Sequence, residues 1–393
     1  MRRELIIAAG PGEWQAALLE DGIAVELRIE RGDGYEAGSI HLGRVRRLLP
    51  ALGAAWVEIG GERLGFLPQS AVLPRGRRLD EGERVVVQIR REAQGGKAVR
   101  LTTGLELPAS VAEIISGHAA RRDPPARLHP SAGFAAALAA AMAAVDAIAV
   151  DEPAVIPALR TAFPDTEIGH QPETRWPVDL NALFDEALAP SLALPGGGSV
   201  HFTATAAAMM IDVDSGTPES GSPAQSALTV DLAATRLVAR QLRLRQLGGG
   251  IVVDFAGLDD RRARERVAGR LGRALAGDPA KPQLLGWTRL GHFELVRPRR
   301  LRPLGEALLE PAAGGALVKT PVTVAFAALR ALHRADRAQP GQRWRLIVAP
   351  LVAAALAGPA AEGRRGLEQR LGREVAVLAD PQLDSAQFQI VSL

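Results

Sequence analysis

Two apolar segments of the chain each end in an acidic residue, and a helical pattern separates them. MMIDVD at 209–214 runs from apolar residues into Asp212, and IVVDF at 251–255 reaches Asp254 in the same way. Between them, 229–247 carries apolar side chains at the spacing of an amphipathic helix. A strand, a crossover helix and a second strand make a βαβ unit, whose strands lie parallel. The sequence therefore predicts that both acids lie at the carboxyl edge of one sheet.

Two acids at one sheet edge indicate a specific chemistry. Neighbouring carboxylates repel each other, so a bare pair would take up a proton. Mg²⁺ relieves this repulsion, because it binds one or two carboxylates together with water and phosphate oxygens. A cation held in this way can activate water to hydrolyse a phosphodiester. Arginine clusters at 236–245, 261–273 and 289–302 would then hold the polyanion, unless they are simply solvated helix faces.

The acids also have a structural interpretation. An aspartate at a strand end commonly caps the turn or helix that follows. Asp214 precedes a Ser-Gly pair, which is a good turn sequence, and the acids at 259–260 suit a helix start. The pattern alone leaves this alternative open for Asp212, Asp214 and Asp254.

The other segments predict a multidomain chain of the α+β or α/β class. Five short strands within 36–107 are typical of a small closed barrel of the OB type. The glycines at 248–250 are expected to end the preceding helix. The domains expected are N-terminal strands at 1–35 that pack with 133–200, the barrel at 36–107, an irregular linker at 108–132, a metal-binding domain at 201–305, and a small α/β domain at 306–393.

Composition argues against several classes of protein. The 393 residues include no cysteine, which rules out disulfides and thiolate metal sites and suits a reducing compartment. No stretch approaches the about 18–20 apolar residues of a membrane span, and the first apolar run is too short for a signal peptide. We therefore expect a cytoplasmic protein with no membrane partner. The net charge of +3 is too small to indicate nucleic-acid binding by itself.

The longest motifs carry a family resemblance. ARQLRLRQLGGGIVVDF at 239–255, with MIDVDSG at 210–216 and LRPLGE at 301–306, resembles the catalytic core of the ribonuclease E/G family. Segments 41–68 and 79–108 are similar to the family's OB-type RNA-binding domain. Segment 331–356 is similar to its small C-terminal domain. Most of the chain is covered, and 133–200 would be a reduced ribonuclease-H-like region.

The resemblance implies a Mg²⁺-dependent endoribonuclease that cuts single-stranded RNA, in RNA processing, rRNA processing or decay. By position, Asp212 and Asp254 match the family's two metal-binding aspartates. Asp214 stands where the family normally has an asparagine that orients the first aspartate. The extra carboxylate either serves as a third ligand and catalytic group or disturbs the site.

Five further residues match RNA-contacting positions of the family. Trp56, Phe66 and Lys97 in the barrel correspond to an aromatic pair and a lysine that contact RNA. The alternation of AAWVEIG independently places Trp56 on the outer face, although it could instead pack against a neighbouring domain. Lys281 replaces an arginine near the family's pocket for the RNA 5′-monophosphate, and Arg289 matches a basic position near the catalytic core.

Two further departures from the family leave alternatives open. The paired cysteines that join protomers through zinc are absent, so no zinc is expected and any homo-oligomer must form otherwise. The segment 108–150 is short and lacks the Arg-Thr pair of the 5′-end sensor, which is therefore missing or rebuilt. The Ser-rich segment 215–227 is either a loop that closes over RNA or a connector. A catalytically weakened RNA-binding relative, and a nuclease acting on structured precursor rRNA, remain competing hypotheses.

Overall fold

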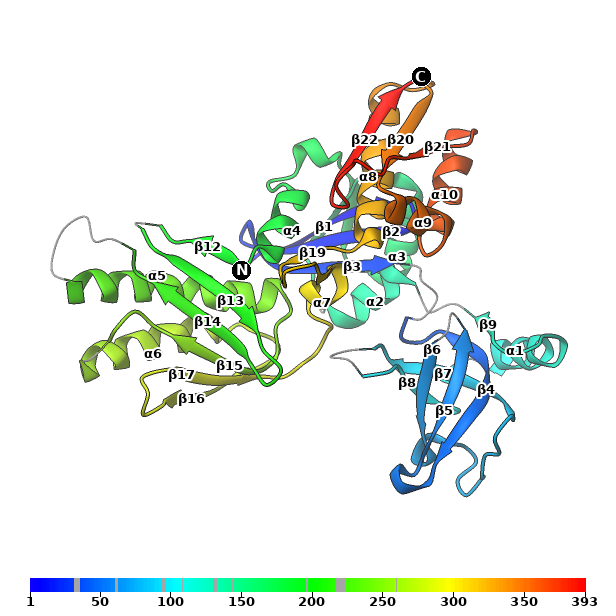
Figure 1. The fold of residues 1–393 in the computed structure, drawn as a ribbon, viewed down its shortest axis with the longest axis horizontal. Coiled ribbons are helices and arrows are strands. Elements are labelled where there is room, and N and C mark those ends of the chain that lie inside the picture. Colours follow the sequence, from blue (N-terminus) through cyan, green and yellow to red (C-terminus); the bar gives the residue numbers. More distant parts are fainter. Residues whose placement is uncertain are drawn as a thin grey trace.

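The fold combines α and β structure, with one closed barrel and several separate sheets (Figure 1). The computed structural model describes residues 1–31, 36–60, 63–93, 97–107, 109–129, 133–142, 144–195, 197–216, 223–258 and 260–393. The predicted mixed architecture with a five-stranded closed barrel is confirmed. Residues 217–222 of the Ser-rich segment at 215–227 lie outside the described residues, and so does Asp259.

The N-terminal strands share a sheet with strands from the middle of the chain. Its order is β11-β10-β1-β2-β3, formed by β1 Arg3–Gly10, β2 Glu13–Glu20, β3 Ile23–Arg31, β10 Ala147–Val150 and β11 Glu167–His170. Strands β10 and β11 run parallel to β1, whereas β1 to β3 form an antiparallel meander. Alternation along β1 sends Leu5 and Ile7 into one core and Ile6 and Ala8 into another. Burial on both faces explains the unbroken apolar run of this strand.

Helices cover both faces of this sheet. The first core receives Leu138 from α2 (Phe134–Ala141) and Leu159 from α3 (Ile156–Ala162). The second receives residues of α4 (Leu180–Leu188) and α7 (Leu304–Leu308). The chain thus returns to the N-terminal sheet at α7, far along the sequence.

The barrel forms from β4 to β8. Its strands are β4 Ile40–Leu49, β5 Ala54–Gly60, β6 Arg63–Pro68, β7 Arg84–Arg91 and β8 Arg100–Thr102. They pair in the order β5-β6-β8-β7-β4, and a β4–β5 ladder closes the ring. Alternate residues such as Val57, Val87 and Leu101 fill the interior. The opposite side of each strand is left for outward-facing side chains.

The prediction of an irregular linker at 108–132 is wrong. This segment holds helix α1 (Ala109–Arg121) and strand β9 (Ala126–His129), and β9 pairs with β4. Ile115 of α1 packs with Ile40, Leu42 and Leu128 in a small core of its own. The apolar partners of this helix lie on the outside of β4, so no pattern within the segment itself indicated a packed element.

The largest remaining sheet carries the two strand-end acids. Its order is β12-β13-β14-β15-β17-β16, formed by β12 Ser191–Ala193, β13 Ser199–Ala204, β14 Met209–Asp214, β15 Gly249–Asp254, β16 Gln283–Trp287 and β17 Phe293–Arg297. Strands β14 and β15 are parallel, as the βαβ pattern predicted, whereas the other pairs are antiparallel. Helices α5 (Pro223–Leu244) and α6 (Arg261–Leu275) pack on one face with the apolar residues of β14 and β15. The other face stays accessible.

The arginines of α5 join this helix to the N-terminal sheet. Arg243 donates two hydrogen bonds of 2.9 Å to the carboxylate of Glu20 on β2. Arg240 donates to the carbonyl oxygen of Ala24 at 2.9 Å and forms an ion pair with Glu186 of α4. These guanidinium groups are largely buried and paired, so the expectation that 236–245 holds a polyanion is wrong for them.

Arg245 and Gln246 complete the same interface. Arg245 donates to the carbonyl oxygen of Ala189 at 2.7 Å, and its guanidinium carbon lies 4.0 Å from the ring centroid of Phe202. Gln246 donates from its side chain to the carbonyl oxygen of Leu27. Gln246 also takes the left-handed conformation, with φ of 60°, that turns the chain out of α5. The glycines at 248–250 were expected to end the helix, but the chain has already turned before them.

The C-terminal region is a three-stranded sheet with helices. It comprises β20 Trp344–Val348, β21 Ala376–Ala379 and β22 Phe388–Ser392, with α8 Pro321–Ala338, α9 Pro350–Ala357 and α10 Ala361–Leu371, and it follows the hairpin β18 Leu309–Pro311 and β19 Leu317–Lys319. Glu13, which is fully buried, forms ion pairs with Arg31 and with Arg330 of α8. Gly12 has φ of 72°, and a Cβ there would lie 2.5 Å from the Cα of Gly363 in α10. The close approach therefore requires glycine.

Within the part of the chain that the structure describes, no helix is both long and apolar enough to cross a membrane.

We predict that Arg243→Gln lowers the free energy of unfolding by about 3 kcal/mol, because it leaves the carboxylate of Glu20 buried without its bidentate partner. Urea unfolding followed by circular dichroism measures this change. Arg236→Gln is the matched control, since Arg236 is exposed on the same helix. Equal effects of the two substitutions would contradict a stabilising role of the Arg243–Glu20 pair.

Candidate functional site

Asp212 and Asp254 lie side by side on the accessible face of the sheet. They are register partners at the carboxyl ends of the parallel strands β14 and β15. Their neighbours Ile211 and Val253 point to the opposite face and pack in the core with α5 and α6. Asp212 is exposed, and the Asp254 side chain is 50% exposed. Neighbouring strands are about 4.8 Å apart, so one ion with oxygen ligands can contact both carboxylates.

Two histidines extend this pair into a row across four strands. His201 of β13 is the register partner of Asp212. His292, just before β17, lies beside Asp254, with 3.5 Å between its Nε2 and the Oδ2 of Asp254. The Oγ of Ser199 lies 2.9 Å from Nε2 of His201. The place of His292 beside Asp254 follows from the antiparallel β15–β17 ladder, which no local sequence pattern shows.

The row as a whole is too wide to surround one ion. Among the described residues, no group of three or more His, Asp or Glu side chains is arranged to hold a metal. The donor set for a hard cation is therefore the central pair Asp212 and Asp254, supplemented by water and substrate oxygens. The histidines stand at either end of that pair.

The structural interpretation applies to Asp214 but not to the central pair. The Oδ1 of Asp214 accepts a hydrogen bond of 2.9 Å from the backbone N–H of Gly216, as in a capped turn. Asp260 likewise caps α6, accepting from Ala263 at 2.9 Å. Within the described segments, no backbone N–H donates to the side chain of Asp212 or Asp254, so neither is used as a cap there.

A third carboxylate, missed by the sequence analysis, lies beneath the site. Asp231 of α5 is fully buried, and its Oδ1 accepts a hydrogen bond of 2.9 Å from the N–H of Ala256, two residues after Asp254. Its Oδ2 has no partner among the described residues. Burial raises the pKa of Asp231 to about 6, and the negative charge of Asp254 acts in the same direction. The sequence could have indicated the burial of Asp231 through its position, because it falls on the same helical face as the buried Val238 and Leu242.

The β16–β17 hairpin brings Arg289 to the site and keeps Lys281 away. The turn that holds Arg289 is closed by a bond of 2.8 Å from the N–H of Thr288 to the carbonyl oxygen of His292, so it lies at the Asp254 end of the sheet. Lys281 precedes β16 at the other end, in a turn with φ of 52°. Measured along the strand direction, Lys281 and Asp254 are separated by roughly six residues at about 3.3 Å per residue. The structure therefore does not bring Lys281 together with the acids.

The barrel brings the two predicted aromatic residues into contact. Trp56 of β5 and Phe66 of β6 are register partners on the outer face, with ring centroids 5.6 Å apart and an interplanar angle of 73°. Both are half-buried, whereas Val57 fills the barrel interior. Lys97 is exposed on the segment that leads to β8.

Register also reveals two arginines that the sequence analysis did not select. Arg47 of β4 is the partner of Trp56, and Arg100 of β8 is the partner of Phe66. Both side chains are exposed, and neither forms an ion pair within the described residues. The aromatic pair is thus flanked on both sides by unpaired positive charge.

Comparison with known proteins identifies the family. The model of the Ribonuclease E/G family matches residues 77–300, which include Asp212, Asp214 and Asp254. The chain belongs to the ribonuclease E/G family. The resemblance inferred from the motifs is thereby confirmed.

Relatives within the ribonuclease E/G family extend the similarity over the whole chain. Ribonuclease G of Salmonella typhimurium (strain SL1344) is 25% identical over 494 aligned positions that cover 100% of both proteins. Ribonuclease G of Escherichia coli (strain K12) is 25% identical over 493 positions, again with 100% of both covered. Ribonuclease E of Synechocystis sp. (strain ATCC 27184 / PCC 6803 / Kazusa) is 26% identical over 416 positions, which cover 82% of this chain and 61% of that protein. These alignments are longer than the 393 residues of this chain, so the chain has gaps in them. Such gaps are expected of a shortened family member.

Asp231 yields a prediction about pH. Its pKa rises from 3.8 in the unfolded chain to about 6 in the fold, so the folded state binds the proton more tightly. The stability that protonation gives is therefore fully present below pH 3.8 and is lost as pH rises to about 6. Relative to Asp231→Asn, which keeps the acceptor for Ala256, the wild type should lose on the order of 2–3 kcal/mol across this window. Urea unfolding at a series of pH values measures the difference.

The exposed Asp165 provides the control for this experiment. Asp165→Asn removes a surface carboxylate and controls for the general effect of this type of substitution at each pH. A constant difference between wild type and Asp231→Asn from pH 4 to pH 7 would contradict the raised pKa.

Proposed function

We propose that this protein is a Mg²⁺-dependent endoribonuclease that hydrolyses phosphodiester bonds of single-stranded RNA. One observation carries the proposal: Asp212 and Asp254 are register partners on an accessible sheet face within the region that matches the family. Two relatives that align over their full length are named Ribonuclease G. An enzyme of this kind would act in the cytoplasm, in RNA or rRNA processing or in decay.

The chemistry follows from the charges around the acid pair. Mg²⁺, when bound, would neutralise charge on the phosphate and activate a water molecule. Asp212 and Asp254 would hold that ion, and Arg289 at the edge of the sheet would orient a phosphate through its planar guanidinium. His292, beside Asp254, limits where the phosphate can lie. Cleavage would leave 5′-phosphate and 3′-hydroxyl ends.

We propose that the barrel is an OB-type RNA-binding domain. Its strand order, with the third strand parallel to the fifth, and its outward aromatic pair on the second and third strands are typical of that fold. Bases of a single strand would stack on Trp56 and Phe66, with Arg47, Arg100 and Lys97 near the phosphates. The sheet of β1–β3, β10 and β11 would then correspond to the reduced ribonuclease-H-like region, and the 5′-end sensor would be absent or rebuilt.

A second candidate function has one observation in its favour. Asp214 replaces the asparagine of the family and adds a carboxylate two residues from Asp212, where one of its oxygens is already engaged with Gly216. If this charge disturbs the acid pair, the protein is an RNA-binding relative with little nuclease activity. RNA affinity without Mg²⁺-dependent cleavage would identify that function.

Asp212→Asn and Asp254→Asn should each reduce Mg²⁺-dependent cleavage of a fluorescent RNA oligomer at least about 100-fold, because one anionic ligand of the ion is lost. RNA binding by anisotropy should remain within about two-fold, since the barrel is unchanged. Asp260→Asn is the matched control, because asparagine also caps a helix well. Full cleavage by Asp254→Asn would overturn the site assignment.

Trp56→Ala should weaken binding of single-stranded RNA by about 1–3 kcal/mol, because one stacking surface is removed. Trp56→Phe keeps an aromatic face and should recover most of the affinity. Filter binding at one fixed salt concentration measures both variants. If alanine and phenylalanine bind RNA equally well, Trp56 is not a stacking residue.

A further inference from the structure

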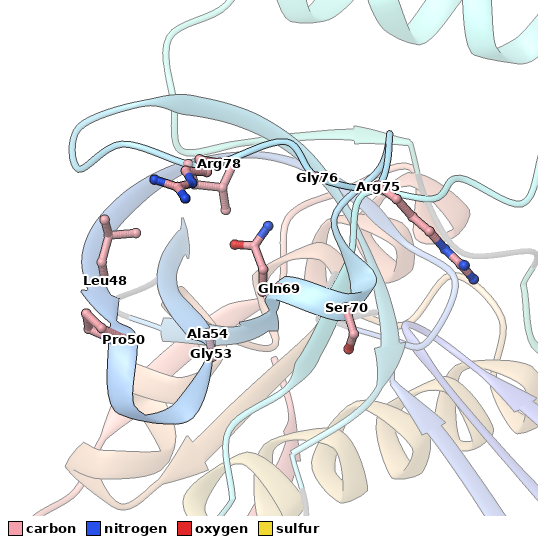
Figure 2. A pocket seen from close by; sticks show the side chains of 10 residues that line it. Leu48, Pro50, Gly53, Ala54, Gln69, Ser70, Arg75, Gly76 and Arg78 are labelled. Carbon is pink, nitrogen blue, oxygen red and sulfur yellow. The ribbon is translucent and has the colours of Figure 1, made fainter.

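A pocket of about 840 Å³ opens at one end of the barrel (Figure 2). It lies between the turn that joins β4 to β5 and the loop that follows β6. Gly53 and Ala54 line it from the turn side, and Gln69, Arg75 and Arg78 line it from the loop side. None of these residues belongs to the acid pair or to the aromatic pair described above.

The pocket carries unpaired positive charge. Arg75 and Arg78 are exposed, and neither forms a hydrogen bond or ion pair with another described residue. Two of the three nearby acids are occupied elsewhere: Glu81 accepts from the N–H of Leu48 at 2.9 Å, and Glu83 is paired with Arg77. The third, Asp80, is exposed and forms no ion pair with a described residue. An anion at the pocket therefore meets the guanidinium of Arg78, while that of Arg75 lies at the rim and is directed outward. Guanidinium groups bind phosphate well.

The rest of the lining suits a nucleoside. Gln69 donates from its side-chain nitrogen to the carbonyl oxygen of Arg77 at 2.5 Å, which fixes its orientation. Its side-chain oxygen accepts from no described residue and can accept from a base or a sugar hydroxyl. Leu48 and Leu79 supply apolar surface. Figure 2 shows Gln69 directed into the pocket with Arg78 on the Leu48 side, whereas the Arg75 side chain extends away from both.

Register connects the pocket to the aromatic pair. Ala54 pairs with Pro68, and two positions further along the same ladder Trp56 pairs with Phe66. Residues two apart in a strand point to the same face, and two steps span about 7 Å. The pocket at the end of the barrel therefore begins about 7 Å along the strand from Trp56, about the spacing of one nucleotide.

We propose that this pocket is a second nucleotide subsite. It receives the nucleoside and adjoining phosphates of single-stranded RNA next to the bases that stack on Trp56 and Phe66. The identity of the ligand rests on the proposed function, whereas the place of the subsite rests on the pocket itself. Arg75 and Arg78, which lie apart, contact different phosphates.

The test measures how RNA affinity depends on salt. Each phosphate contact on a single strand contributes about 0.7 to the slope of log K against log salt concentration, so two lost contacts lower the slope by about 1.4. Arg75→Gln/Arg78→Gln, made in the Asp254→Asn protein to prevent cleavage, should show this loss in anisotropy titrations with oligouridylate. Arg75→Lys/Arg78→Lys keeps the charge and should recover most of the slope.

The matched control is Arg160→Gln/Arg365→Gln. Both arginines are exposed and lie outside the barrel, so the net charge changes equally while the pocket is untouched. An unchanged slope in the pocket variant, or an equal loss in the control, overturns the subsite. Cleavage by the otherwise unmodified protein is assayed in parallel, so that failure of the nuclease proposal is recognised separately. Absence of any RNA binding would overturn both proposals.

Discussion

The ion pairs between α5 and the N-terminal sheet hold the candidate site in place. Arg240, Arg243 and Arg245 reach strands and helices from more than 50 residues away in the sequence, and each ends on a carboxylate or a backbone carbonyl. Buried guanidinium groups tolerate few alternative arrangements, because an unpaired buried charge costs several kcal/mol. Strand β15 starts only a few residues after α5. The orientation of this helix therefore decides where Asp254 emerges next to Asp212.

The same ion pairs leave the acid pair without compensating charge. The arginines at the end of α5 point toward Glu20 and Glu186, away from the accessible face, and no described lysine or arginine forms an ion pair with Asp212 or Asp254. Asp231, which is buried beneath the pair, is a third carboxylate. The negative charge of Asp254 disfavours its ionised form. Since no described lysine or arginine pairs with these carboxylates, a bound cation is the simplest source of balancing charge.

Much of the fold could be predicted from local patterns, whereas the site depends on register between distant strands. Alternating residues revealed the barrel strands, and the βαβ pattern placed Asp212 and Asp254 on adjacent parallel strands. No local pattern places His292 beside Asp254, because that contact comes from an antiparallel ladder with β17. Helix α1 was missed for a related reason, since Ile115 packs on the outside of β4. The arginine cluster at 236–245 was misread, because composition does not distinguish a paired buried guanidinium from a free exposed one.

Sorting the arginines by their partners separates two functions of positive charge. Arg240 and Arg243 of α5 are structural, and their removal would loosen the joint between two sheets. Those of the barrel, Arg47, Arg75, Arg78 and Arg100, are exposed and form no ion pair with described residues. Exposed arginines that form no ion pair with described residues also lie beside the acid-bearing sheet, for example Arg262 and Arg266 of α6 and Arg289 of the β16–β17 turn. Under the proposed function, the barrel would bind RNA and the sheet of β14 and β15 would cut it. A substrate must be long enough to reach from one to the other, so cutting efficiency should depend on RNA length more steeply than binding does.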